Sequence, residues 1–587
     1  MILPALVRYY KRLEAGGVAI PKPGYAEQKV HFEILLEPDG KLFAINDLRT
    51  PNGKKLAPRV MQLPSIARSG SALNSQFTWD NTQYVLGAVQ PDQPKKKRER
   101  APLAFAAFRD RHIDRLKEIK DVPVVAAFLR FIKEWSPDRA AELDAWEDIC
   151  GEAGPNFVFR LRKEKQYLHD HPKVEERWRD IQTEQADDPI EGFCLIGGER
   201  TELARLHPMV KGVDGGQARG GSLVGFNNQA FTSYGKDQSY NAPTGTRAAF
   251  EYSTALSYLL RRDGSNRHRM KIVDMTVGFW AESDTCMETY FGEICDPPQS
   301  MDESEAKKLG DFLERIRDGR LADIPDLHPE TRFYILGLTP NSARLVVRFW
   351  CQCTVGKLAD NLASHYRDIE MIRAFDRDPR FPSIWQIIRQ TARETKDISP
   401  LLNGQFAQAV FQGSRYPDNL LGAVMNRIRA DQTINYLRAA LIRALLVRNR
   451  KENIPVTLDT SCTDIGYVLG RLFAVLEKIQ EEAQPGINAT IKDRCFTAAS
   501  ATPVTVFPRL VRLSNHHLGK LENVGRRVNF ERLLGKIIDC LSANDGGFPA
   551  HLAAVEQGKF IIGYYQQRTD FFTTKENSEE EAVETAS

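Results

Sequence analysis

The sequence predicts an α+β protein, in which a mixed N-terminal α/β domain with helical insertions precedes a C-terminal helical bundle. Two observations lead to this prediction. Strand-like runs and turns alternate with helical segments over roughly the first 400 residues, and nearly every later segment is helical. A chain of 587 residues also exceeds what one compact core can hold. We therefore expect an N-terminal domain over 1–400, a bundle over 401–572 and a disordered acidic tail over 573–587.

The N-terminal part starts with a short amphipathic helix and then alternates apolar and polar residues. Residues 31–49, HFEILLEPDGKLFAINDLR, predict two strands around the turn PDG. Glycine, serine and proline between 51 and 76 indicate a long polar loop, and 79–87 resume a strand-like pattern. Residues 91–100 are typical of a solvated linker, so we expect the helical insertion to begin after them.

The pattern of the C-terminal part is nearly all helical. Residues 426–449 and 460–483 are long, amphipathic and free of interior proline. Several such helices with short connections predict a bundle. The last residues, 573–587, are acidic and lack large apolar groups after Phe572, which is typical of a disordered tail.

Composition excludes some classes of protein and leaves others open. No apolar run approaches the roughly 20 residues of a membrane span, and no basic region precedes the first apolar stretch. We therefore expect a cytoplasmic protein with no membrane partner. Nine scattered cysteines indicate free thiols. The net charge of +3 is nearly neutral, so only a local concentration of charge can predict nucleic-acid binding.

The motifs of enzymes are absent or incomplete. The pair His169-Asp170 matches the metal-ligand core of one hydrolase class, but no convincing further ligands accompany it. Cys351 and Cys353 lack the second pair that a zinc site needs. No phosphate loop of the Walker type and no Gly-x-Ser-x-Gly elbow occurs. We expect no enzyme, no catalytic residue, no metal and no cofactor. A metal-dependent nuclease or hydrolase that uses His169 and Asp170 is the alternative.

Residues 222–260 carry the most informative pattern, SLVGFNNQAFTSYGKDQSYNAPTGTRAAFEYSTALSYLL. Amide, hydroxyl and basic side chains are interleaved with aromatic ones before a helix, and such groups can contact phosphates or base edges. The same composition also fits a polar turn that leads into a core helix. The candidate phosphate or RNA contacts are Asn227, Asn228, Gln229, Ser233, Lys236, Gln238, Asn241, Arg247, Arg261 and Arg262.

A second candidate is a run of arginines in the expected bundle. Between 426 and 451 the basic residues face one acid, Asp431. A helix with leucines on one side and arginines on the other can bury one face and follow phosphates with the other, although a solvated charged face is an equal alternative. The arginines are Arg427, Arg429, Arg438, Arg443, Arg448 and Arg450.

Residues 222–260 resemble the large-subunit family of the type I-C CRISPR Cascade, also described as the Dvulg-subtype large-subunit family. The resemblance rests on Phe-Asn at 226–227, Ser-Tyr-Gly-Lys at 233–236 and Asn-Ala-Pro at 241–243, followed by the alanine- and tyrosine-rich helix. The opening ILPALVRYYKRL, the run WDNTQYVLG and the run GYYQQRTDFFTTK are similar to family landmarks too. The chain departs from the family pattern at Ser239 and Gln566.

The resemblance implies a non-catalytic subunit of an RNA-guided surveillance complex. Such subunits recognise a protospacer-adjacent motif on target double-stranded DNA, help to open the duplex and hold the displaced single strand. The implied partners are a CRISPR RNA, backbone and handle-binding subunits, a small subunit and a recruited helicase-nuclease. Most sequence specificity is then delegated to pairing between RNA and DNA. The bundle resembles the small subunit, and Met425 is a plausible internal start for a separate copy of it.

These roles can be assigned to the candidate residues. The minor groove presents mainly acceptors, which suit donors on a loop. We expect the loop at 51–76 to read the motif through Lys54, Lys55, Asn74, Ser75 and Gln76. We expect 226–241 to contact phosphate or the RNA handle, and the arginines of 427–451 to hold the displaced strand.

Overall fold

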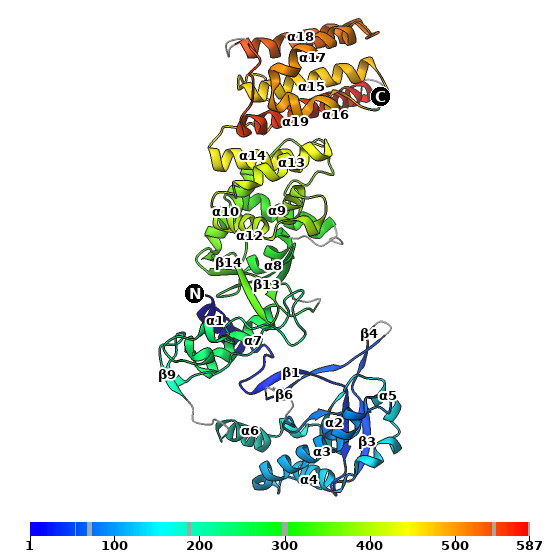
Figure 1. The fold of residues 1–587 in the computed structure, drawn as a ribbon, viewed down its shortest axis with the longest axis vertical. Coiled ribbons are helices and arrows are strands. Elements are labelled where there is room, and N and C mark those ends of the chain that lie inside the picture. Colours follow the sequence, from blue (N-terminus) through cyan, green and yellow to red (C-terminus); the bar gives the residue numbers. More distant parts are fainter. Residues whose placement is uncertain are drawn as a thin grey trace. The chain divides into compact units, whose positions relative to one another are not determined.

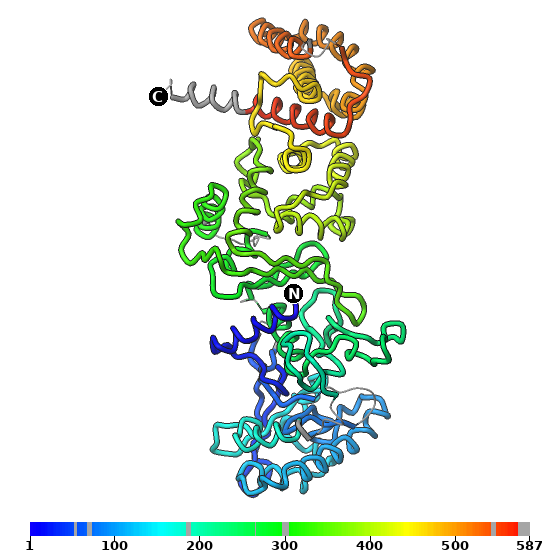
Figure 2. The backbone as a smooth tube through the Cα atoms, turned by 90° about the vertical axis from the view of Figure 1, so that its left-hand side faces the viewer, coloured from blue at the N-terminus to red at the C-terminus, as the bar shows by residue number. Residues whose placement is uncertain are grey.

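The computed structural model describes residues 1–52, 55–66, 73–184, 190–263, 266–295, 303–542 and 547–584. Contacts between Cα atoms divide the chain into two compact units (Figures 1 and 2). The first, here the C-terminal unit, comprises 1–12, 206–231 and 255–587. The second, here the N-terminal unit, comprises 13–205 and 232–254. Strands lie mainly in the first half of the chain and helices dominate the second half, which confirms the α+β class.

The N-terminal unit is built around a four-stranded mixed sheet of order β3-β2-β8-β7. Strand β2 pairs in parallel with β8, while β3 and β7 pair antiparallel at the two edges. A separate ribbon pairs β1 with β6. The strands are β1 (Tyr25–Val30), β2 (Phe32–Leu36), β3 (Leu42–Asp47), β4 (Thr50–Asn52), β5 (Lys55–Ala57), β6 (Arg59–Pro64), β7 (Asp80–Asn81), β8 (Asn156–Leu161), β9 (Glu191–Phe193) and β10 (Arg200–Glu202).

Helices cover this sheet and bury an aromatic core. Phe128 and Phe159 lie with ring centroids 4.7 Å apart, and Phe108 stacks on Phe159 at 6.5 Å. Burying large aromatic rings contributes most of the stabilisation in a core of this size. The helices of this unit are α2 (Thr82–Val85), α3 (Lys95–Arg115), α4 (Pro123–Glu134), α5 (Trp146–Cys150) and α6 (Pro172–Glu184). Helix α1 (Ile2–Ala15) and helix α7 (Thr246–Leu259) each contribute residues to both units.

The C-terminal unit joins an antiparallel sheet to a helical region. Strands β11 (Arg269–Ile272), β12 (Met275–Ala281), β13 (Arg332–Asn341) and β14 (Arg344–Thr354) form a meander in chain order. One hydrophobic core extends from Met270 to Tyr565, on both sides of residue 400. The helices are α8 (Cys286–Cys295), α9 (Glu303–Arg317), α10 (Val355–Ile369), α11 (Ile384–Ile388), α12 (Pro400–Gln412), α13 (Asn419–Asp431), α14 (Tyr436–Arg450), α15 (Ile465–Ala483), α16 (Ile491–Ala501), α17 (Pro503–Leu518), α18 (Val524–Ser542) and α19 (Ala554–Glu584).

Glycines allow α15 and α19 to approach closely in the middle of this helical region. A Cβ at Gly470 would lie 2.0 Å from the Phe560 carbonyl oxygen, and one at Gly563 would lie 2.2 Å from the Tyr467 carbonyl oxygen. Any larger residue at these positions would therefore force the two helices apart. Figures 1 and 2 show α15–α19 grouped at the C-terminal end of the chain.

Several local predictions are confirmed and several are wrong. The hairpin at 31–49 and the helix at 460–483 are confirmed as elements. The helix expected at 426–449 is interrupted, because Gln432 adopts a left-handed conformation that ends α13 before α14 begins at Tyr436. The strand expected over 79–87 is wrong after Asn81, because the Asn81 side chain accepts from the Gln83 N–H and starts α2. Strands β4–β6 occupy much of the expected loop, and α3 begins inside the expected linker.

The expected division into a domain over 1–400 and a bundle over 401–572 remains a prediction. The expected tail at 573–587 begins within the bounds of α19, and its side chains lie outside the described residues.

Candidate nucleic-acid interface

The first half of the polar segment is an exposed loop that contacts β14. Ser222 and Arg344 form a parallel bridge, which places the Arg344 side chain over the loop. The guanidinium donates to the Asn227 side-chain oxygen and lies 4.6 Å from the centroid of the Phe231 ring. Asn228 is exposed and its side-chain oxygen accepts from the backbone at the start of η4 (Gln229–Phe231). The loop therefore presents amides and an aromatic ring around one arginine.

The second half is a tight turn that one asparagine holds in place. The Asn241 side chain accepts from the Ser233 N–H at 2.8 Å and donates to the carbonyls of Lys236 and Gln238 at 2.6 and 2.9 Å. Tyr234 lies at the tip with φ +52° and is 98 % exposed. A left-handed conformation is unusual for a tyrosine and costs free energy. The turn therefore holds an aromatic ring away from the protein, with Lys236 exposed beside it.

The remaining candidates of this segment differ in what they contact. Gln238, in η5 (Gln238–Asn241), accepts from the Arg205 guanidinium at 3.0 Å. Arg247 is 72 % exposed and donates to the carboxylate of Glu251 at 2.7 Å. The Asn241 side chain is used in the hydrogen bonds that hold the turn. Gln229 and Arg247 lie on the surface.

The two arginines at the end of α7 are engaged inside the C-terminal unit. Arg261 donates to Asp263, and its guanidinium lies 3.8 Å from the centroid of the Tyr258 ring. Arg262 donates to the Val213 carbonyl at 3.0 Å. Both side chains are fixed by protein partners, although the Arg262 side chain is still 56 % exposed.

The expected motif-reading loop is only partly available to a ligand. Lys54 lies outside the described residues, and Lys55 begins β5. Asn74 is exposed, but Ser75 and Gln76 are buried, so their assignment as free contacts is wrong. The Gln76 side chain accepts from the Ile66 N–H at 2.9 Å and donates to its carbonyl at 3.1 Å, which satisfies its amide within the protein.

The arginine run was expected to lie on a solvent-exposed helix face, and this is wrong for three of its six arginines. Arg438, Arg443 and Arg448 are buried between helices. Arg443 donates to three backbone carbonyls at 2.7–3.1 Å, and burial lowers its pKa. Arg448 donates to Asp368 at 2.6 Å and lies over the Tyr416 ring. These cations satisfy carbonyl and carboxylate oxygens inside the protein, so they cannot form a solvent-facing stripe.

The other three arginines of the run lie closer to the surface. Arg427 donates to Asp431, and hydrogen bonds from Arg438 and Arg427 hold the pKa of that carboxyl below its usual range. Arg429 donates to Gln557 at 2.6 Å. Arg450 is 49 % exposed and lies 3.8 Å from Asp418.

A basic stripe that the sequence reasoning missed lies on α17. Arg509, Arg512 and His516 recur at spacings of three and four residues, all three are exposed, and α17 contains no acidic residue. Within the described residues, no ion pair involves any of these three side chains. The spacing places them on one helical face, a pattern that was visible in the sequence. On α18, Arg532 and Lys536 are exposed as well.

Arg344 and Arg205 were also missed, and no local pattern could have found them. Arg344 contacts Asn227 across 117 residues of sequence, and Arg205 contacts Gln238 across 33. These contacts depend on the fold and not on neighbouring residues.

The proposed hydrolase pair is not part of a larger ligand cluster. His169 Nε2 lies 3.4 Å from an Asp170 oxygen in η3 (Leu168–Asp170), and the His169 ring stacks on Tyr167. Burial lowers the pKa of His169 to about 3 and raises that of Asp170. Among the residues that the structure describes, no group of three or more His, Cys, Asp or Glu side chains could hold a metal ion.

Two further sequence expectations can be compared with the structure. All nine cysteines lie in the described part of the chain and none of them forms a disulfide bond, and Cys351 and Cys353 have sulfur atoms 4.0 Å apart. No helix in the described ranges is both long and apolar enough to cross a membrane.

Comparison with protein families gives a match over nearly the whole chain. Residues 6–572 match a family model described as CRISPR-associated protein (Cas_Csd1). This match confirms the resemblance inferred from the sequence. A search of curated proteins found no match.

Proposed function

Because the chain belongs to the CRISPR-associated protein family Cas_Csd1, we propose that it is the non-catalytic large subunit of a type I-C RNA-guided surveillance complex. In this role it recognises the protospacer-adjacent motif, promotes opening of the duplex and holds the displaced strand. Its partners are the CRISPR RNA, the target DNA, the other subunits of the complex and a helicase-nuclease that cuts. The observation that carries the proposal is the family match over nearly the whole chain.

The turn at 233–238 is the part of the surface best suited to touch nucleic acid. It presents Tyr234 and Lys236 in a conformation that Asn241 fixes beforehand. An exposed aromatic ring can stack on a base, and a neighbouring cation can contact a phosphate. Because the turn is already ordered, binding costs little conformational entropy. We assign the phosphate or RNA contact to this turn, and we propose Asn228 and Gln229, in the C-terminal unit, as separate contacts.

Motif reading is assigned to the segment 51–76, through Lys54, Lys55 and Asn74. Ser75 and Gln76 act as the buried end of this segment and not as its contacts. If Lys54→Ala together with Asn74→Ala leaves motif-dependent DNA binding unchanged, this assignment is wrong.

We assign the displaced strand to the stripe of Arg509, Arg512 and His516 on α17. Arg450, which is the most exposed arginine of the run at 427–450, is kept as a further contact. Arg509 and Arg512 have no ion pair within the described residues, so they suit a strand backbone better than arginines that already bind carbonyl groups.

The contact of the turn is tested by a double substitution in the assembled complex. Tyr234→Ala with Lys236→Ala removes the stacking surface and one phosphate contact, so we expect DNA or RNA affinity to fall about tenfold or more. Tyr234→Phe with Lys236→Arg should retain affinity, because ring and charge remain. The matched control is Leu103→Ala with Lys117→Ala, two exposed residues outside the turn. If the Tyr234→Ala, Lys236→Ala variant binds nucleic acid as tightly as this control, the turn does not contact nucleic acid.

A further inference from the structure

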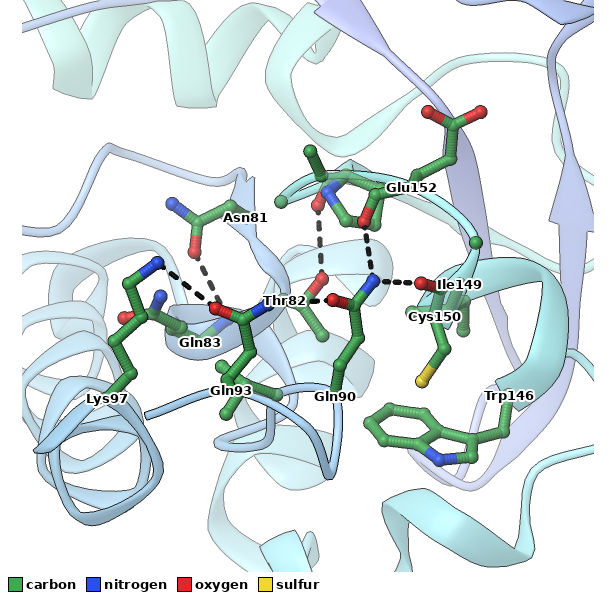
Figure 3. Close-up of a pocket in the computed structure, with 15 residues that line it drawn as sticks. Asn81, Thr82, Gln83, Gln90, Gln93, Lys97, Trp146, Ile149, Cys150 and Glu152 are labelled. Carbon is green, nitrogen blue, oxygen red and sulfur yellow. Dashed lines mark hydrogen bonds between the residues drawn. The ribbon is translucent and has the colours of Figure 1, made fainter. Parts of the chain in front are cut away.

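A pocket in the N-terminal unit lies apart from the residues assigned above. Fifteen residues line a cavity of about 400 Å³ between the start of α2, the start of α3 and the segment that joins α5 to β8 (Figure 3). This volume is within the range, roughly 300–1,000 Å³, of pockets that hold small organic ligands. Amide side chains and one aromatic ring dominate the lining.

Trp146 supplies a flat apolar surface on one side of this pocket. It is the first residue of α5 and is half-buried. Figure 3 shows its indole ring below the thiol of Cys150, with Lys97 and Gln93 on the opposite side. An indole that is accessible from a cavity can stack on a planar ligand.

A chain of hydrogen bonds orders the polar wall. Lys97 Nζ donates to Gln93 Oε1 at 3.1 Å, and Gln93 Nε2 donates to Gln90 Oε1 at 3.0 Å. Gln90 Nε2 in turn donates to the carbonyls of Cys150 and Glu152 (Figure 3). Both N–H groups of Gln90 are thereby used, while Gln93 retains one N–H and each amide oxygen retains an acceptor site.

A further amide in the lining is available to a ligand. No hydrogen bond of the Gln83 side chain is found within the described residues. A free amide beside ordered ones can pair with both donors and acceptors on the edge of a planar ligand.

The charges around the pocket favour an anion on the side of α3. Lys97 and Glu152 are the charged side chains of the lining, and Glu152 binds Arg49 at 2.7 Å. Lys97 is therefore left without an opposing carboxylate in the pocket. Three lysines, 95–97, open α3, and its first turn has no acid and no side-chain cap. Cations at this end oppose the helix dipole, and a bound anion would relieve that repulsion.

We propose that this pocket binds a single unstacked nucleotide, with its base against Trp146 and its phosphate at Lys97. The planar base matches the indole, the amides of Gln83 and Gln93 match its polar edge, and the lysine matches its phosphate. The nucleotide belongs to a single strand of nucleic acid. This inference rests on the proposed function, since that function brings single strands to the chain.

The test uses the full chain and a short single-stranded RNA that carries 5-iodouridine. Irradiation and mass spectrometry identify the crosslinked residue, and fluorescence anisotropy measures the affinity. We expect a crosslink at Trp146 and at least a fivefold loss of affinity in Trp146→Ala. Trp146→Phe should retain most of the affinity. Lys97→Glu should weaken binding more than Lys117→Glu, which reverses an exposed charge outside the pocket.

The arms of this experiment separate the possible outcomes. Uridine monophosphate that competes as well as the RNA would overturn the assignment of this nucleotide to a single strand and identify a free nucleotide as the ligand. Crosslinks only at other residues, or unchanged affinity in both Trp146→Ala and Lys97→Glu, would show that this pocket does not bind the nucleotide. In that case, loss of DNA binding by the turn variant would show that the proposed function still holds. Unchanged DNA binding by both sets of variants in the assembled complex would remove both proposals.

Discussion

Arg443 illustrates, at the scale of one residue, how burial changes the role of a basic side chain. In sequence it belongs to an arginine-rich run, but in the structure it bridges the carbonyls of Arg367, Asp368 and Ile454. Within the described residues these bonds link α14 to the end of α10 and to the segment after α14. Its contribution is therefore to stability and not to ligand binding.

Removing this guanidinium should destabilise the C-terminal unit. Arg443→Ala leaves three carbonyl groups without their donor, so we expect a loss of about 2–3 kcal/mol in the free energy of unfolding. Arg450→Ala is the matched control on the same helix, and its exposed side chain predicts a change below about 0.5 kcal/mol. Denaturant unfolding followed by circular dichroism measures both. Similar midpoints for the two variants would contradict the structural role.

At the scale of elements, α17 combines a buried apolar face with an exposed basic one. Phe507 and Leu510 are buried, whereas Arg509, Arg512 and His516 face solvent. Such a helix can pack on the bundle and still follow a phosphate backbone.

Salt dependence tests this helix as a strand-binding element. Arg509→Ala with Arg512→Ala removes two phosphate contacts, so the slope of log affinity against log salt should become shallower by about 1.4 for single-stranded DNA. Lys133→Ala with Arg139→Ala removes the same charge from exposed positions elsewhere. An equal change in the control would mean that net charge, and not the stripe, determines binding.

These elements could be predicted from the sequence where neighbouring residues determine them, and not where packing between distant segments does. Periodicity predicted α14 and α15 because apolar spacing reflects burial directly. It could not distinguish Arg443 from Arg450, since both belong to one basic helix and only the packing of other helices separates them. The strand expected at 79–87 failed because a single asparagine cap overrides a weak alternating pattern.

At the scale of the whole molecule, buried histidines link stability to pH. Burial lowers the pKa of His112, His169 and His365 to about 3 and that of His207 to about 4. In the unfolded chain each would titrate near 6.5. Below pH 6.5 the unfolded state therefore binds protons that the folded state does not, and stability falls as pH falls towards 4.

This linkage predicts a loss of stability in mild acid. Between pH 7 and 5.5 each of these histidines should cost about 1.2 kcal/mol. Melting temperatures measured across this range should decrease steadily, and His112→Gln should reduce the total loss of stability by about 1.2 kcal/mol. A constant melting temperature in the wild-type protein would contradict the burial of these imidazoles.

The candidate site was also only partly predictable at this scale. The sequence pattern at 222–260 located the exposed turn, because amides and glycine in one run are typical of surface turns. It did not reveal that Asn241 supports the turn while Tyr234 projects from it. The contacts of Arg344 and Arg205 join distant parts of the sequence and required the fold.

The central claim is that this chain gives an RNA-guided complex its preference for a motif-bearing target. The direct measurement is the affinity of the assembled RNA-loaded complex, with and without the chain, for matched duplexes that carry or lack the adjacent motif. We predict that the complex with the chain binds the motif-bearing duplex more tightly and that this preference disappears without it. Equal affinities for the two duplexes when the chain is present would contradict the account.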